Sequence, residues 1–123
     1  LSSTWGAGDI LASAQGVFTI DAIESQGLLD NATERGRQMQ ELLADADPHG
    51  VVDIRGKGLM LAVEFETADL RDAVQAAAFE RGFLILGCGK RTIRLLPPLD
   101  VTEREIRMGA ELFVESAAAA VSQ

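Results

Sequence analysis

The sequence is poor in the residues that mark several classes of protein. Among its 123 residues there is one cysteine, Cys88, and one histidine, His49. A single cysteine excludes an internal disulfide framework and suits a reducing compartment, so we expect a cytoplasmic protein. Cys88 has no nearby histidine or second cysteine, and His49 stands alone in a turn. The sequence therefore predicts neither a metal site nor a nucleophilic cysteine.

Long apolar runs are also missing. The longest of them, such as Leu59 to Val63, fall far short of the roughly 20 residues that a membrane-spanning helix needs. No basic region followed by an apolar stretch opens the sequence, so we expect no signal peptide and no membrane partner. Hydrophobic residues still make up 47% of the chain, the usual share for a globular protein. The length suits one domain with a core of its own.

Basic residues are few, and lysine is nearly absent. Two lysines and nine arginines stand against 19 acidic residues, for a formal net charge of −8. A nucleic-acid binder needs a basic stripe, so no nucleic-acid partner is expected. An acidic surface poor in lysine can keep a protein soluble in high salt, and we hypothesise a salt-loving source. Because the chain starts at Leu1 with a polar, glycine-rich stretch, we interpret it as a piece of a longer protein.

The hydrophobic pattern predicts four helices and four strands in the order ααββαββα. Helices are expected over about 9–26, 28–44 and 68–81, and a last one begins at the capping box Thr102–Glu105. Its alanine-rich end, 117–123, is expected to fray. Strands are expected over 51–55, 59–66, 83–86 and 92–96, with loops over 56–58 and 87–90. This order predicts an α+β fold, a small antiparallel sheet with packed helices.

Two segments could bind anionic groups. Residues 2–8 combine hydroxyls, glycines and the start of a helix, where backbone N–H groups and the helix dipole can hold a phosphate. A flexible loop with a helix cap is the more frequent outcome for this pattern. Arg94 lies between Ile93 and Leu95, so it points to the opposite face of its strand and is suited to binding a carboxylate. An arginine that reaches solvent, or pairs with a structural acid, fits the same pattern equally well.

Other charged residues are not expected to do chemistry. Lys57 and Lys90 lie in glycine-flanked turns, which supply no desolvated amine for a Schiff base. Glu64 and Glu66 are expected on one strand face, in contact with solvent. The residues by themselves thus suggest a phosphate loop and a carboxylate-binding arginine, with no catalytic base.

Several segments resemble the class III (omega-amino-acid type) PLP-dependent aminotransferases. The sequence Ser-Thr-Trp-Gly-Ala-Gly at 3–8 resembles the family's Ser-Thr-aromatic-Gly-Gly-Asn segment, although Ala7, Gly8 and Asp9 replace its Gly-Asn-Pro. Residues 55–60 match its Arg-Gly-Lys-Gly-Leu-Met hairpin. Residues 93–99 match its Ile-Arg-x-x-Pro-Pro-Leu strand, which a Thr-x-x-Glu helix cap follows. The matches keep the family's order, and Gly-Cys-Gly-Lys at 87–90 is most like the archaeal 4-aminobutyrate aminotransferases.

The resemblance implies fold type I, with this chain matching the C-terminal part of a member. Residues 1–27 would be a phosphate-loop segment and interdomain helix, and 28–123 the C-terminal small domain. Thr4, with Ser3, would bind the phosphate of pyridoxal 5'-phosphate across a homodimer interface, in the neighbouring subunit's site. Arg94 would bind the substrate's carboxylate. The Schiff-base lysine of the family lies upstream, so the chain holds no catalytic residue and would be inactive alone.

The function implied is amino-group transfer. The parent would move an amino group from an omega-amino acid such as 4-aminobutyrate to a 2-oxo acid such as 2-oxoglutarate. Four alternatives remain open. Two belong to the same family, a PLP-dependent amino-acid racemase and a lysine aminotransferase. The others are a free-standing carboxylate-binding α+β module and a structural dimerisation piece.

Overall fold

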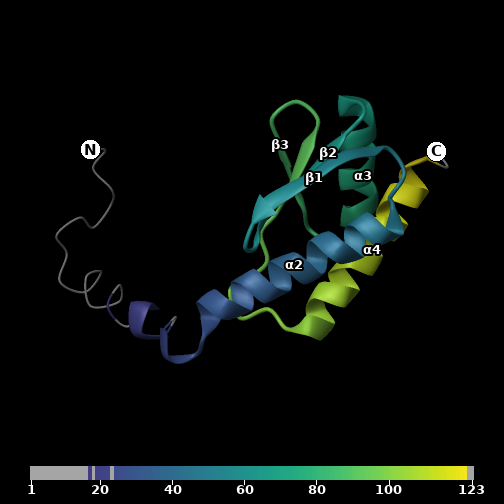
Figure 1. The fold of residues 1–123 in the computed structure, drawn as a ribbon. Helices are drawn as coiled ribbons and strands as arrows, with labels where there is room; N and C mark the ends of the chain where they lie inside the picture. The colour runs from purple at the N-terminus through teal and green to yellow at the C-terminus, as the bar shows by residue number, and fades with distance from the viewer. Residues whose placement is uncertain (1–16, 18, 23, 122–123) are drawn as a thin grey trace, which may run out of the picture.

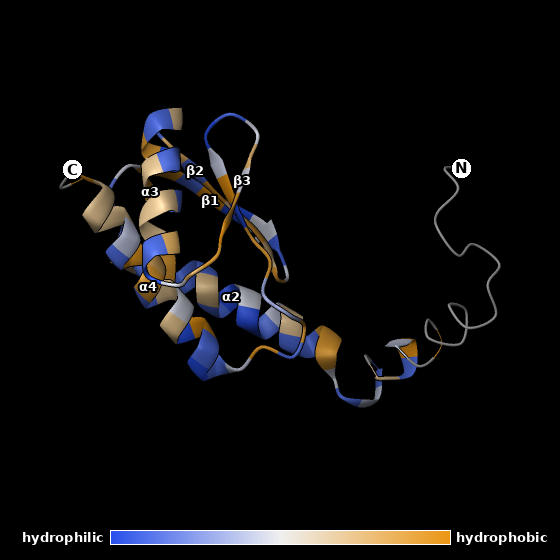
Figure 2. Cartoon of the chain, turned by 180° about the vertical axis from the view of Figure 1, so that it is seen from behind, coloured by the Kyte–Doolittle hydropathy of each residue, from blue (hydrophilic) through white to orange (hydrophobic). Residues whose placement is uncertain are grey.

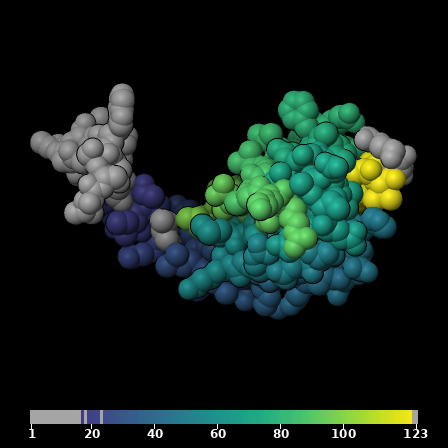
Figure 3. All heavy atoms as spheres, turned by 90° about the horizontal axis from the view of Figure 1, so that it is seen from above, coloured from purple at the N-terminus to yellow at the C-terminus, as the bar shows by residue number. Residues whose placement is uncertain are grey.

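The computed structural model describes residues 17, 19–22 and 24–121 (Figure 1). The described residues between 17 and 25 are helical, and the turn that ends them has Gly27 at a positive φ of 64°. They lie at one side of the molecule, next to the start of α2 (Figure 3). The elements that follow are α2 (Leu28–Ala46), β1 (Val51–Lys57), β2 (Met60–Phe65), α3 (Ala68–Glu80), β3 (Leu86–Cys88), β4 (Thr92–Leu95) and α4 (Glu103–Val121).

The strands form one antiparallel sheet in the order β1-β2-β4-β3. One face of it packs against the helices, with α2 against β1 and α3 against β2, β3 and β4, while α4 packs on α2 and α3. The fold is therefore the α+β arrangement that the order of elements predicted. No helix in the described part of the chain is long and apolar enough to cross a membrane.

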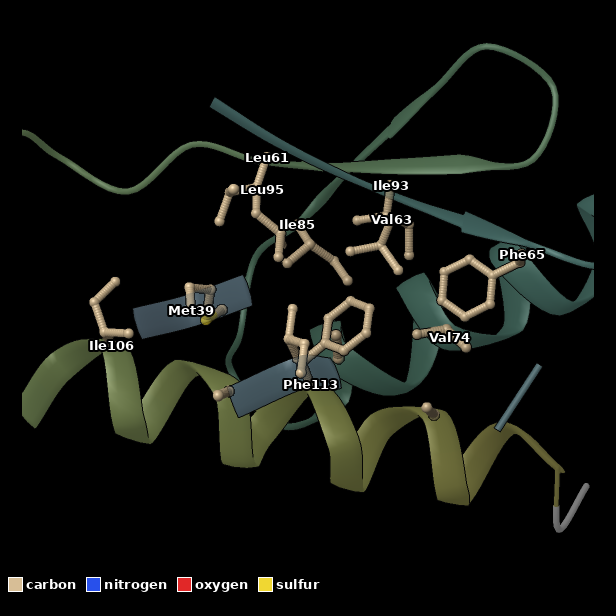
Figure 4. Close-up of a cluster of buried hydrophobic side chains, with 14 of the residues drawn as sticks. Met39, Leu61, Val63, Phe65, Val74, Ile85, Ile93, Leu95, Ile106 and Phe113 are labelled. Carbon is tan, nitrogen blue, oxygen red and sulfur yellow. The ribbon is translucent and has the colours of Figure 1, made fainter. Parts of the chain in front are cut away.

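The alternation of side chains in β2 builds the core. Leu61, Val63 and Phe65 are fully buried, and the register places Leu95 opposite Leu61 and Ile93 opposite Val63. Figure 4 shows these side chains pointing from the sheet toward the helices, where Met39, Val74 and Phe113 complete the cluster. The residues between them, at 62, 64 and 94, are left on the other face, which we call the outer face of the sheet.

Side-chain caps fix where two helices begin. The Thr67 hydroxyl accepts a hydrogen bond of 3.1 Å from the Leu70 N–H at the start of α3. At α4 the predicted capping box is confirmed, because Thr102 Oγ1 accepts from the Glu105 N–H and Glu105 Oε1 accepts from the Thr102 N–H, each at 3.1 Å. The expected fraying of α4 is wrong as far as Val121, because Ala117 and Ala120 are buried in the core.

The strand expected over 83–86 is the main error in the predicted elements. Strand β3 covers Leu86–Cys88 instead, pairing with β4 as Leu86–Arg94, Gly87–Ile93 and Cys88–Thr92. The hydrophobic segment before it, which Figure 2 shows in orange, leads from α3 into β3 without pairing. Its apolar residues suggested a strand, but Gly89, with φ 61°, sets the turn, and the strand lies directly before this turn.

Candidate carboxylate-binding site

Arg94 lies where the sequence placed it, on the face opposite its buried neighbours. Ile93 is fully buried and Leu95 is 4% exposed, whereas Arg94 is exposed on the outer face of the sheet. Its guanidinium makes no hydrogen bond or ion pair with any described residue. Within this part of the chain the arginine does not serve a structural ion pair, and its donors are available to a ligand.

Uncharged residues flank Arg94 across both neighbouring strands. The register places Ala62 of β2 directly opposite it on one side and Leu86 of β3 on the other. Opposite residues of antiparallel strands have Cβ atoms about 4.5–5.5 Å apart, so a carboxylate at either position would reach the guanidinium. Neither side chain can neutralise the cation. The site can therefore bind an anion without first breaking an internal pair with these neighbours.

A largely apolar cavity of about 350 Å³ adjoins Arg94. Its walls come from the segment leading into β3, from the end of β4 with Pro97 and Pro98, and from the start of α4. Its other charged lining residue is Glu105, whose Oε1 already accepts hydrogen bonds from the Thr102 N–H and hydroxyl. Of the two charged lining residues, Arg94 is thus the cation and the hydrogen-bond donor.

The loop after β4 is tied to α2. Asn31 Nδ2 donates hydrogen bonds to the carbonyl oxygens of Leu99 at 2.8 Å and Val101 at 2.9 Å. Gln38 Nε2 donates to the carbonyl oxygen of Glu103 at 3.1 Å. These bonds join segments far apart in the sequence and hold the end of β4 and the start of α4 in place. They position the wall of the cavity beside Arg94.

Glu64 corrects one expectation. The sequence suggested a solvated carboxylate, but its side chain is 25% exposed and lies between Arg55 of β1 and Arg91 of the β3–β4 turn. Arg91 Nη2 donates to Glu64 Oε2 at 3.2 Å, and Arg55 Nη1 lies 3.7 Å from Glu64 Oε1. Arg55 also donates to Asp53 Oδ2 at 3.0 Å. Sequence reasoning missed this network, because strand alternation gives the face of each residue but not its partner across the sheet.

The remaining candidate residues are exposed, although Lys57 and Cys88 lie at the ends of strands β1 and β3 and not in the loops expected over 56–58 and 87–90. His49, Lys57, Cys88 and Lys90 are exposed, and neither lysine forms an ion pair within the described ranges. Lys57 ends β1 and Lys90 lies in the β3–β4 turn, so neither amine is desolvated. No group of three metal-ligating side chains occurs among the described residues.

The predicted phosphate loop is not part of the site that can be described. Ser3 and Thr4 lie outside the described residues. Their role, and the division of the chain into 1–27 and 28–123, stay predictions. Hydroxyls and glycine N–H groups are donors that fit a phosphate, so the residue types present agree with the group they would hold.

Two curated relatives resemble this chain in sequence. The L-lysine-epsilon aminotransferase of Amycolatopsis lactamdurans is 38% identical over 122 residues, covering 96% of this chain and 27% of that protein. Acetylornithine aminotransferase 1 of Bordetella pertussis is 42% identical over 105 residues, covering 84% of this chain and 26% of that protein. The chain thus spans about a quarter of the length of these relatives. Their names support the class of enzyme, while 4-aminobutyrate as a substrate stays a prediction.

Solved structures and a family model agree with these relatives. The lysine aminotransferase of M. tuberculosis superposes with a TM-score of 0.78 at 30% identity, covering 98% of this chain and 28% of that one. The ornithine aminotransferase of Toxoplasma gondii has the same TM-score of 0.78 at 27% identity, covering 86% and 26%. Both are aminotransferases of fold type I. The aminotransferase class-III model matches residues 1–116, and the chain belongs to the class III aminotransferase family.

Proposed function

We propose that the full-length protein is a PLP-dependent transaminase in which this chain supplies the substrate's carboxylate-binding arginine. The observation that carries the proposal is the state of Arg94, whose guanidinium is exposed and has no partner in the described part of the chain. The chain that holds it belongs to the class III aminotransferases. Arginine binds a carboxylate through two parallel N–H donors, which fixes the orientation of the substrate as well as its position. Transfer of an amino group to a planar cofactor requires a substrate held in a fixed orientation, and this contact provides it.

The residues of this chain indicate which roles it has in the reaction and which roles belong to the rest of the protein. Arg94 binds the carboxylate, and a largely apolar cavity adjoins it. When bound, the cofactor supplies the electron sink for amino-group transfer. Thr4 and Ser3 would hold its phosphate in the neighbouring subunit of a homodimer. Because Lys57 and Lys90 are both exposed, the Schiff-base lysine is expected in the part of the protein outside this chain.

The amino donor is proposed as an amino acid whose reacting amino group is distant from the carboxylate. The names of the relatives, lysine-epsilon and acetylornithine aminotransferase, describe donors of this type, and 4-aminobutyrate belongs to the same chemical class. The acceptor is proposed as a 2-oxo acid such as 2-oxoglutarate. One arginine can serve both half-reactions, because donor and acceptor each carry a carboxylate.

An assay of the full-length protein tests this function. Lysine, N-acetylornithine and 4-aminobutyrate are supplied in turn with 2-oxoglutarate, and glutamate formation is measured. We expect Arg94→Ala to raise KM for 2-oxoglutarate about ten- to hundredfold, the loss of one charge-assisted interaction of about 1.5–3 kcal/mol. An unchanged KM would remove Arg94 from the site. Racemisation of an amino acid without any oxo acid would identify the racemase alternative instead.

A further inference from the structure

Arg71 of α3 reaches the hairpin formed by β3 and β4. Its Nη1 donates hydrogen bonds to the carbonyl oxygens of Thr92 at 3.1 Å and Gly89 at 3.5 Å. Gly89 follows the end of β3 and Thr92 begins β4, so the two carbonyl groups lie on either side of the turn. Arg71 Nε donates to Asp72 Oδ1 at 2.7 Å, and the Arg71 side chain is only 13% exposed. One largely buried cation thus joins a helix to both sides of the turn.

Gly87 of β3 leaves the space that this guanidinium occupies. A Cβ at position 87 would lie 2.8 Å from Arg71 Nη1 and 3.2 Å from Arg71 Cζ. The register places Gly87 opposite the fully buried Ile93, so a side chain there would point toward the helices. Any larger residue at position 87 would push the guanidinium away from the turn. The first glycine of the Gly-Cys-Gly sequence at 87–89 is therefore matched to Arg71.

Strand β3 has few other contacts that could hold it in place. It is a three-residue edge strand, and none of its residues is buried in the described part of the chain. A segment with so few buried contacts opens easily unless polar bonds fix it. The register places Leu86 of this strand directly opposite Arg94, and Thr92 precedes Arg94 by two residues on β4. The bonds from Arg71 therefore fix the backbone on the β3 side of Arg94.

We propose that Arg71 is a positioning residue for binding of the substrate's carboxylate. Through the space that Gly87 leaves, it binds the carbonyl groups of the turn, holds β3 against β4 and so fixes the orientation of Arg94. This inference rests on the proposed function of Arg94. Arg71 does not touch the substrate in this account, because it lies on the helical side of the sheet and Arg94 lies on the outer face. Its loss would let the hairpin move and misalign the two donors that meet the carboxylate.

Variants of Arg71 and Gly87 in the full-length protein test this role. Arg71→Ala should raise KM for 2-oxoglutarate about three- to tenfold, below the roughly hundredfold cost that a displacement of about 1 Å can reach. The kcat and the dissociation constant of PLP should change little, since Arg71 contacts neither reacting group. Arg71→Lys keeps a cation that can donate to both carbonyl groups, and its KM should stay near the wild-type value.

A double-mutant cycle tests whether the two residues act together. Gly87→Ala displaces the guanidinium and should raise KM to a similar extent as Arg71→Ala. The double variant R71A/G87A should be no worse than Arg71→Ala alone, because no guanidinium is left for the new Cβ to displace. R71K/G87A should be closer to the wild type than Gly87→Ala, because an ammonium group is slimmer than a guanidinium.

Arg81, at the end of α3, is the matched control. Its Nη1 donates to the carbonyl oxygen of Ala77 at 3.0 Å, a bond made within the same helix. Arg81→Ala removes an arginine and a bond to a backbone carbonyl, as Arg71→Ala does, but leaves the turn between β3 and β4 untouched. It should leave KM unchanged, and a rise equal to that of Arg71→Ala would overturn the inference.

The remaining outcomes separate this inference from the proposed function. A KM unaffected by Arg71→Ala, an Arg71→Lys variant as impaired as Arg71→Ala, or additive effects in the cycle overturns the positioning role, while Arg94→Ala still reports on the site. A KM unaffected by Arg94→Ala overturns the proposed function itself. If Arg71→Ala yields too little folded protein, Gly87→Ala and R71K/G87A decide the question. Equal KM values in these two variants would overturn the inference.

Discussion

Gly36 of α2 lies against Gly58 in the turn between β1 and β2, so close that a Cβ on Gly36 would overlap the carbonyl oxygen of Gly58. This contact brings the middle of a helix onto the backbone of the hairpin. Gly58 has a positive φ of 57°, which suits a residue without a side chain. The hairpin carrying Arg55 and Ala62 is thereby fixed against the helical layer.

Helix propensity alone would favour alanine over glycine at position 36, but the close approach of Gly36 to the hairpin predicts that this substitution destabilises the fold. We expect Gly36→Ala to lower the free energy of unfolding by about 1–3 kcal/mol, the usual cost of an overpacked contact. Gly109 of α4 is the matched control, because a Cβ there would meet its nearest neighbours at 3.9 Å, an ordinary contact distance. Gly109→Ala should be neutral or stabilise by up to about 1 kcal/mol. Urea unfolding of both variants measures this difference, and equal effects would contradict it.

The position of Ala62 opposite Arg94 allows a test of how a neighbouring charge affects binding of the 2-oxo acid. Ala62→Glu places a carboxylate directly opposite Arg94, and we expect KM for the 2-oxo acid to rise about three- to tenfold. Ala62→Gln has the same size without the charge and should raise KM much less. Steady-state kinetics of the two variants separate charge from bulk. Equal KM values would mean that size, rather than charge, is what this position controls.

The capping box predicts a local stability effect at the start of α4. Thr102→Ala removes the hydroxyl that accepts from the Glu105 N–H, so the free energy of unfolding should fall by about 1 kcal/mol. Thr102→Ser keeps the acceptor and should be close to the wild type. Chemical denaturation followed by circular dichroism measures both. A serine variant as unstable as the alanine one would show that the methyl group of Thr102 matters more than its hydroxyl.

Arg37 and Glu34 on α2 predict a pH dependence. The hydrogen bond from Arg37, and then its charge, hold the pKa of Glu34 below its ordinary value of 4.5. Because the folded-state pKa is lowered, the contribution of this pair to stability is present above the unfolded-state pKa and is lost as pH falls through the folded-state pKa. Arg37→Gln should raise the pKa of Glu34 toward 4.5 in an NMR titration. An unchanged titration would mean that the pair does not form in solution.

The role proposed for Thr4 predicts that replacing it weakens the binding of PLP. If its hydroxyl holds the phosphate of PLP, Thr4→Ala should weaken PLP binding about tenfold in the full-length protein, while Thr4→Ser should retain it. Equilibrium dialysis against free PLP measures the dissociation constant without any turnover. Wild-type affinity in the alanine variant would assign the loop a purely structural role.

Much of the fold could be predicted because its signals are local. The capping box at Thr102, the turn glycines and the alternation around Ile93 and Leu95 each depend on residues close in sequence. They were sufficient to predict three of the strands and the helices α2, α3 and α4 to within a few residues, together with the α+β class. Arg94 was placed on the correct face for the same reason, since side-chain direction in a strand follows from alternation.

The errors and omissions have a common cause in pairing between distant segments. Segment 83–86 is as apolar as a strand, yet the register with β4 puts the strand at Leu86–Cys88. The sequence by itself determined the order of the elements, the faces of β2 and β4, and the family resemblance. Only the tertiary structure decided that Glu64 contacts Arg91 and Arg55 and that Arg94 has no partner among the described residues. Glu64 and Arg91 are 27 residues apart in the sequence, so their contact depends on which strands become neighbours and in which register.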